Sequence, residues 1–419
     1  MSGDIDTPAP TADRLRAVLH RWADEDAFGA GGHEGTVWRG GALRMAAPAG
    51  RESYADPFGH TCLEWEFGRW TSPWTELPFT ATDIIPSWTA DAPDGARVTV
   101  RLQIRDADGA ESGWYVLAHW CAGDAAMHRA TVPGQSDAHG HVEADTFTAG
   151  PRGAAAYRLS VVLAREAGGT AGVALTRLQA VASRAPRGVP AAVSEPGGAW
   201  GTVLDVPGRS QDVHAGHCPQ WDGGGEAWAG PACTAMLVEF FGRGPAPRDL
   251  LWLDPDDPAP QVDFAARHVY DYSYKGCGNW AFNTAYPARF GLYGLVVRLP
   301  SLTDVERFIT AGIPVATSLA FRGGELWGTA HAASARQAYA PYSYATAGNI
   351  MVVRGFTASG DVVVNDPLSP SDDTTRRVYP RADFERVWLS GDGGGGAAFL
   401  VHPPDHPLPP AVPGEPPRW

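Results

Sequence analysis

The residues with the clearest chemical potential lie between positions 211 and 241. This stretch reads as a glycine-rich loop followed by an apolar helix, and it carries two thiols, Cys218 and Cys233. A thiol attacks as its thiolate, which the N-terminus of a helix favours. The junction between loop and helix would therefore suit a catalytic cysteine, but the junction residue is Ala229. The stretch has the form of a thiol site without a thiol at its key position.

The same loop offers three potential metal donors, His214, His217 and Cys218. One loop without a second donor cluster is a weak metal signal. The five cysteines include no C-x-x-C pair, so neither a structural zinc site nor a disulfide framework is expected. We therefore expect no metal, no cofactor and mostly buried, free thiols.

The composition limits the class of protein. The chain has 419 residues, of which 44% are hydrophobic and 19% charged, and its net charge is −14. These values predict a globular protein of several domains and argue against nucleic acid or an anionic membrane as a partner. The first residues lack a signal-peptide pattern, and no window is apolar enough to span a membrane. We expect a cytoplasmic protein of undetermined oligomeric state.

Two periodicities divide the chain. Residues 1–35 include a helical pattern in which Leu15, Val18, Leu19 and Trp22 share one face. Residues 36–184 alternate with period two, for example at 98–105, 114–120 and 157–163, and turn signals separate these runs. This pattern predicts an all-β sandwich, with its tryptophans mainly in the core rather than on a carbohydrate-binding face.

Residues 185–199 read as a linker rich in Pro and Gly, and residues 403–419 as a Pro-rich tail. Between them, residues 200–402 show helical patterns at 231–241, 303–312 and 379–389. Strand patterns follow the first two helices at 313–319, 349–356 and 362–366. The fold class is therefore multi-domain, an all-β sandwich followed by an α+β domain.

Several blocks of this second domain carry a family resemblance. They are Gly-Gly-Gly-Glu-Ala-Trp at 223–228, the stretches 261–272, 278–286 and 301–309, Met-Val-Val-Arg-Gly-Phe at 351–356 and Asn-Asp-Pro at 365–367. The second domain resembles the papain-like cysteine peptidases of family C-39, in the actinobacterial branch that has an N-terminal β-sandwich. The sandwich segment is similar as well, so the resemblance covers nearly the whole chain.

The resemblance assigns a role to four positions. It places the nucleophilic cysteine at Ala229, the basic histidine at Asn349 and the residue that orients the base at Asp366. The glutamine that stabilises the oxyanion corresponds to Gln211. Alanine cannot attack a carbonyl, and asparagine has no pKa in the range of a general base. Cysteine-peptidase chemistry at these positions is therefore excluded.

The segment 322–347 looks longer than its counterpart in the family, and it enters directly before Asn349. Long loops are often lids or binding loops. Its His331 is a candidate acid or base. The candidates for ligand binding are Trp228 and the aromatic residues of this segment, Trp327, Tyr339, Tyr342 and Tyr344. Such a lid would favour a small, flat or apolar ligand.

Three functions remain open. The first is a non-proteolytic enzyme acting on a small-molecule or peptide-derived substrate, by cyclisation or acyl or amide chemistry in bacterial specialised metabolism. Its acid–base groups would be Asp366, His331 or Glu226. The second is a pseudo-peptidase that serves as a binding module. The third is a cysteine hydrolase whose nucleophile has moved to Cys233 or Cys218. We favour the first by a narrow margin.

Overall fold

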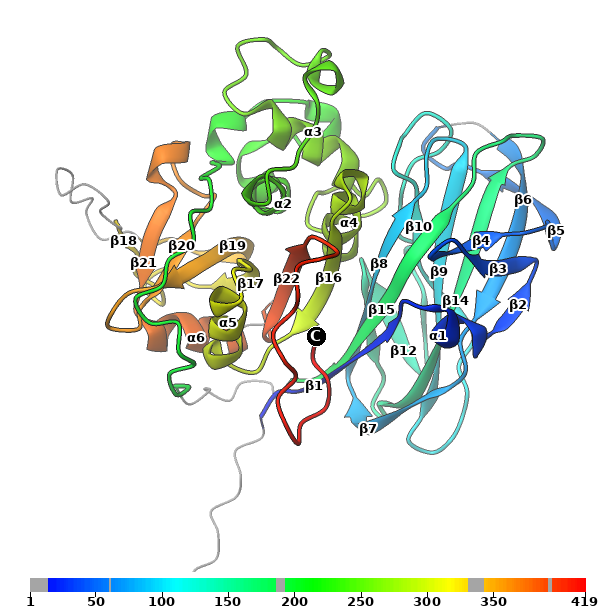
Figure 1. Cartoon of the computed structure of the whole chain (residues 1–419), viewed down its shortest axis with the longest axis horizontal. Coiled ribbons are helices and arrows are strands. Elements are labelled where there is room, and N and C mark those ends of the chain that lie inside the picture. Colours follow the sequence, from blue (N-terminus) through cyan, green and yellow to red (C-terminus); the bar gives the residue numbers. More distant parts are fainter. Residues whose placement is uncertain (1–13, 60–61, 186–192, 331–342, 391–393) are drawn as a thin grey trace, which may run out of the picture.

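The structure, a computed structural model, describes residues 14–59, 62–185, 193–330, 343–390 and 394–419. It has an N-terminal half of two packed β-sheets and a C-terminal half of helices around a third sheet, and the two halves lie side by side (Figure 1). Strand pairs within all three sheets are antiparallel.

The first sheet of the sandwich has eight strands. They are β1 (Arg16–Trp22), β3 (Thr36–Arg39), β4 (Ala42–Met45), β8 (Asp83–Asp91), β11 (Ser136–Asp137), β12 (Gly140–Glu143), β13 (Thr146–Ala149) and β15 (Ala174–Arg184). The second sheet has seven strands. They are β2 (Gly32–Glu34), β5 (Gly50–Ala55), β6 (Cys62–Thr71), β7 (Thr75–Ala81), β9 (Ala96–Asp106), β10 (Tyr115–Trp120) and β14 (Ala154–Glu166). The short helix α1 (Glu25–Gly29) follows β1.

The alternation seen in the sequence builds this sandwich as predicted. Four of its tryptophans, Trp65, Trp70, Trp88 and Trp120, are buried, which confirms their assignment to core packing. The predicted turn after β9 is also present: the Asp106 carboxylate accepts hydrogen bonds from the backbone N–H groups of Asp108 and Ala110.

The prediction of a helix near the N-terminus is wrong. Residues 16–22 form strand β1, which pairs with β15 along its whole length. Val18 and Trp22 face the sandwich core, whereas Ala17 and Leu19 join the core of the C-terminal half. A strand buried on both faces has a nearly continuous apolar run, which periodicity alone does not distinguish from a helix.

The C-terminal half contains the third sheet, in the order β16-β22-β17-β19-β20-β21-β18. Its strands are β16 (Tyr293–Arg298), β17 (Val315–Phe321), β18 (Thr329–Ala330), β19 (Thr346–Phe356), β20 (Val362–Asn365), β21 (Arg376–Tyr379) and β22 (Ala397–His402). Its helices are α2 (Ala229–Phe240), α3 (Pro260–Val269), α4 (Trp280–Ala285), α5 (Leu302–Thr310) and α6 (Arg381–Ser390). The three predicted helices correspond to α2, α5 and α6.

Helix α5 begins one residue before the helix predicted at 303–312. Its N-cap is Ser301, whose hydroxyl accepts from the backbone of Asp304. Glu306 in this helix is buried, and its carboxylate accepts hydrogen bonds from the backbone of Gly197 and Ala199. The end of the predicted linker is therefore fixed against α5.

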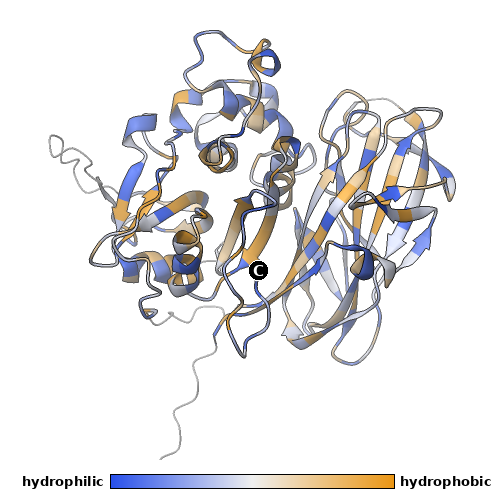
Figure 2. Cartoon of the chain, in the orientation of Figure 1, coloured by the Kyte–Doolittle hydropathy of each residue, from blue (hydrophilic) through white to orange (hydrophobic). Residues whose placement is uncertain are grey.

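The two halves share one interface. Phe282 of α4 packs against Trp88 and Trp120 of the sandwich, with ring centroids 6.3 and 5.1 Å apart. Polar groups reinforce this contact, because Asp271 accepts from the backbone N–H and the hydroxyl of Thr131. Hydrophobic residues run along the sheets that face one another across the contact (Figure 2). The sandwich therefore packs directly against the C-terminal half through apolar and polar contacts.

The Pro-rich segment predicted as a tail packs on the protein. Its last residue, Trp419, is buried beside Phe308 of α5, and the backbone N–H of Leu19 in β1 donates to the carbonyl of Pro417. Arg418 pairs with Asp304 at 2.9 Å. Because Leu19 belongs to the sandwich and Phe308 to the other half, this segment contacts both.

None of the helices in the described parts of the chain has the length and apolar character needed to cross a membrane.

Candidate functional site

The candidate site is a cleft between the two halves, with a volume of about 740 Å³. Ala229, the first residue of α2, and Asn349 of β19 both line it. Helix α2 packs directly on β19 at this point, since the thiol of Cys233, one turn along α2, donates to the carbonyl of Ile350 at 3.1 Å. The structure thus brings together the two positions that the resemblance gives to nucleophile and base.

Asp366 stands behind Asn349, directly after β20, and is fully buried. Its carboxylate accepts from the Tyr379 hydroxyl at 2.9 Å, from the backbone of Leu368 at 3.1 Å and from Asn349 Nδ2 at 3.4 Å. Burial raises the pKa of Asp366 to about 6, although these hydrogen bonds oppose the shift. Asp366 is buried and is not among the residues that line the cleft, so its side chain is not placed for direct contact with a ligand there.

Tyr344 is half-buried and contacts this network, and it is not among the residues that line the cleft. Its hydroxyl accepts from Asn349 Nδ2 at 2.6 Å and lies 3.2 Å from Asp366. Trp327 is 49% exposed and bonds through its indole N–H to Gly324, but it is not among the residues that line the cleft. His331, Tyr339 and Tyr342 lie outside the described residues.

Two further predicted residues do not face the cleft. Trp228 is fully buried and donates its indole N–H to the carbonyl of Trp221, so its assignment to ligand binding is wrong. Gln211 is also buried, and its Oε1 atom has no hydrogen-bond partner among the described residues. Glu226, in contrast, is exposed and lines the cleft as predicted.

Neither candidate for a relocated nucleophile has the required environment. Cys233 is completely buried in the core, and burial holds its thiol pKa well above the usual range. Cys218 is half-buried, does not line the cleft, and has its pKa raised to about 12 by burial and by Asp263. A nucleophilic cysteine needs an accessible thiolate. The structure therefore argues against a cysteine hydrolase that uses either residue.

The sandwich supplies part of the cleft wall, which the sequence did not indicate. The hairpin between β12 and β13 contributes His141, Glu143 and Asp145, and β8 contributes Asp83. Asp145 also caps α4 in the other half by accepting from the backbone N–H groups of Trp280 and Ala281. No local sequence signal marks these residues, because docking of the two halves brings them to the site.

The lining is predominantly acidic. Its carboxylates are Asp83, Glu143, Asp145, Asp222 and Glu226, and its cationic or titratable bases are Arg298 and His141. Burial raises the pKa of Asp145 to about 6, and it also raises the pKa of Asp222. The Arg298 guanidinium is buried and donates to the carbonyls of Gly394 and Gly395, which hold it against the wall. The cleft thus concentrates negative charge.

The comparisons with known proteins agree with this division. Residues 18–183 match the family described as the Peptidase C39 N-terminal domain, and residues 203–393 match the Peptidase_C39 like family. The chain thus has a C39-type N-terminal domain followed by a C39-like domain. Together the two matched segments extend over most of the sequence, and they meet at the interface that forms the cleft. The papain-like arrangement of the second half stays a prediction.

No curated protein matches the chain. Among solved structures, a Clostridium thermocellum endo-1,4-beta-D-xylanase 10B bound to xylohexaose has 12% identity and a TM-score of 0.19, over 46% of this chain and 33% of that one. Tailspike protein 4 of bacteriophage CBA120 has 7% identity and a TM-score of 0.15, over 39% and 19%. This chain thus spans a third or less of those two chains.

A tandem domain from Paenibacillus barcinonensis Xyn10C has 9% identity and a TM-score of 0.19, over 94% of this chain and 98% of that one. At these TM-scores none of the three establishes a shared fold with this chain.

Proposed function

We propose that this C39-like protein uses the cleft to bind a small cationic, polar molecule or peptide-derived ligand, without cysteine-peptidase chemistry. The observation that carries the proposal is the pair of residues that face the cleft where α2 begins beside β19. Ala229 offers a methyl group to the cleft, and the amide of Asn349 is engaged by Tyr344 and Asp366. An open cleft without nucleophile and base favours the pseudo-peptidase, the second of the three functions.

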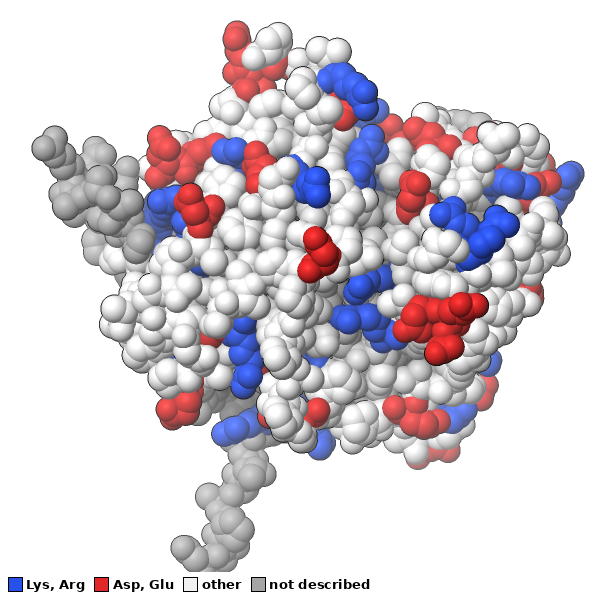
Figure 3. Space-filling view, in the orientation of Figure 1, with Lys and Arg blue, Asp and Glu red and all other residues white. Residues whose placement is uncertain are grey.

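The charge of the cleft indicates the class of ligand. Carboxylates enter it from both halves, Asp83 and Glu143 from the sandwich and Asp222 and Glu226 from the loop before α2. A concave site lined by one sign of charge attracts the opposite charge and raises its local concentration. Elsewhere, acidic and basic groups are interspersed over the face shown in Figure 3. A ligand with amino or guanidino groups therefore suits this cleft better than the flat, apolar ligand expected from the sequence.

A non-proteolytic enzyme is the second candidate, on one specific observation. His141 and Glu143 line the cleft from the sandwich, while Asp222 and Glu226 line it from the other half. Acid–base catalysis needs titratable groups around a substrate, and burial raises the pKa of Asp222 above its ordinary value. Cyclisation or acyl transfer on a small molecule would use such groups in place of the lost dyad.

The test measures binding by isothermal titration calorimetry with spermidine and with a short Lys-Arg peptide. Neutral and anionic analogues of equal size serve as reference ligands. The variant Glu143→Gln/Glu226→Gln keeps the shape of the wall and removes two charges. We expect at least about tenfold weaker binding of the cationic probes, equivalent to about 1.4 kcal/mol.

The matched control is Glu25→Gln, an exposed carboxylate in α1 that does not line the cleft. It should bind like the wild type. Equal binding of neutral and cationic probes, or equal binding by the double variant, would contradict the proposal. Product formation from a bound probe, detected by mass spectrometry and lost in His141→Gln, would favour the enzyme instead.

A further inference from the structure

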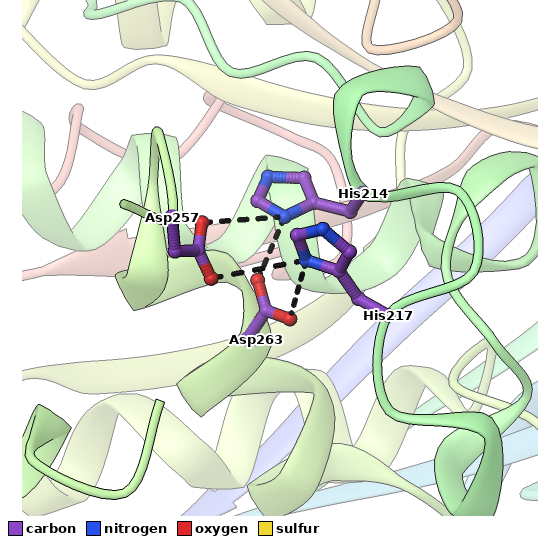
Figure 4. Close-up of side chains that lie close together, drawn as sticks. All are labelled: His214, His217, Asp257 and Asp263. Carbon is purple, nitrogen blue, oxygen red and sulfur yellow. Dashed lines mark hydrogen bonds and ion pairs between the residues drawn. The ribbon is translucent and has the colours of Figure 1, made fainter. Parts of the chain in front are cut away.

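Two imidazoles and two carboxylates converge beside the loop that leads into α2. We call these four residues the His–Asp cluster: His214, His217, Asp257 and Asp263. Their potential ligand atoms all lie within 4.8 Å of one another. Figure 4 shows the two rings pointing their Nδ1 atoms at the carboxylates. The expectation that the histidine pair has no second donor group is therefore wrong.

We propose that the His–Asp cluster binds one divalent transition-metal ion, with zinc as the best match. Two imidazole nitrogens and two carboxylate oxygens form a donor set that suits zinc and its neighbours, whereas calcium and magnesium take oxygen ligands. The proposal does not depend on the function proposed for the cleft, because no member of the cluster lines it.

The separations between donor atoms fit one ion. His214 Nδ1 lies 2.7 Å from an oxygen of Asp263 and 3.9 Å from one of Asp257. For His217 Nδ1 the corresponding distances are 3.0 and 3.8 Å. Ligands about 2.0–2.2 Å from a tetrahedral zinc ion are about 3.3–3.6 Å apart. The four measured distances lie on either side of this value, so small side-chain movements would complete the coordination.

Burial gives independent support for a cation. The side chains of His214, Asp257 and Asp263 are 0, 2 and 1% exposed, respectively. His214 Nδ1 and Asp263 Oδ2 form an ion pair at 2.7 Å, but without the geometry of a hydrogen bond. Buried polar atoms are normally satisfied, and two buried carboxylates side by side repel each other. A metal ion would satisfy both atoms and neutralise the pair.

The fold supplies the donors from two separate segments. The histidines come from the loop that contains the short 3₁₀ helix Asp212–His214. Asp263 lies in the first turn of α3, and Asp257 in the loop before it. His217, with 33% of its side chain exposed, gives the site access to solvent. An ion at this point would fix the loop before α2 to α3, which is the role of a structural site with four protein ligands.

The test uses tag-free protein that has been stripped with a chelator. Zinc alone is then titrated in by calorimetry, and Co²⁺ replaces it for absorption spectroscopy. We expect one zinc per chain, d–d bands of four-coordinate Co²⁺ and a higher melting temperature with zinc. His217→Gln and Asp257→Asn should each weaken zinc binding at least about a hundredfold, the upper end of the loss seen for supporting residues outside the coordination shell.

His141→Gln is the matched control, because it removes an exposed imidazole from the other half. It should bind zinc like the wild type. His217 is partly exposed, so His217→Gln should fold, and circular dichroism checks this. Substoichiometric binding of both metals by folded wild type would overturn the proposal and indicate a metal-free ion-pair network. Equal affinity of wild type and both cluster variants would overturn it too.

Discussion

The Nδ2 atom of Asn349 donates to the carboxylate of Asp366 across 3.4 Å, where the resemblance to the peptidases places a histidine and its orienting partner. The amide thus keeps a donor toward Asp366, and Tyr344 adds a second contact to both. What is lost is a group that can take up a proton at neutral pH. The contacts of Asp366 with position 349 are therefore present, but the side chain at that position is not a titratable base.

These contacts predict that reactivity can be restored. In Ala229→Cys/Asn349→His, the introduced thiol would stand at the first residue of α2 with an imidazole on β19. The helix N-terminus and the imidazole should both lower its pKa below the ordinary value of about 8.5. The pH dependence of alkylation by iodoacetamide measures this pKa.

Ala229→Cys alone is the control for this experiment. Without the imidazole, its thiol should react more slowly at neutral pH and titrate at a higher pH than in the double variant. Identical profiles for the two variants would show that positions 229 and 349 do not act on each other.

The native thiols should react in the order of their exposure. Cys62 is exposed, whereas Cys121, Cys233 and Cys277 are buried, and burial raises the pKa of Cys121 to about 12. Peptide mass spectrometry after brief treatment with iodoacetamide should find the label on Cys62 first. Cys62→Ser should remove the fast phase. Rapid labelling of Cys218 or Cys233 in the native protein would instead support a relocated nucleophile.

Asp366 should make stability depend on pH. Its folded-state pKa of about 6 lies above the ordinary value, so the native state binds more protons than the unfolded state between about pH 4 and pH 6. Stability from this group is therefore present at low pH and is lost as pH rises through 6. The loss is on the order of 2–3 kcal/mol for the size of this shift.

Urea unfolding of wild type and Asp366→Asn across pH 4–7 checks this effect. The variant has no proton to release at this position, so the difference in unfolding free energy should shift in favour of the variant as pH rises. A difference that is constant with pH would show that Asp366 titrates normally.

Asp271 should be the most sensitive polar residue of the interface. This buried carboxylate accepts from Thr131 of the sandwich and, within its own half, from the backbone N–H groups of Ser273 and Tyr274 and from Asn279 Nδ2. Asp271→Ala would leave these donors buried and unsatisfied, at a cost of about 3 kcal/mol or more. The exposed Asp373→Ala should stay within about 0.5 kcal/mol of wild type. Thermal unfolding compares the two.

Much of the fold could be predicted because its signals are local. Alternating residues marked β9, β10 and β14, and a glycine after an apolar run marked the end of α2, where Gly242 has φ of +66°. Strand β1 was missed because its two faces enter different cores, which only the packing of the two halves defines.

The sequence alone determined that Ala229 and Asn349 stand where the resemblance places a nucleophile and a base, and that neither side chain can fill that role whatever surrounds it. Only the tertiary structure decided what surrounds them. His141 and Glu143 reach the cleft by docking of the sandwich, and Asp263 meets His217 across 46 residues of chain. Charge, burial and coordination depend on distances in space, and sequence spacing sets those distances only within one helix, strand or turn.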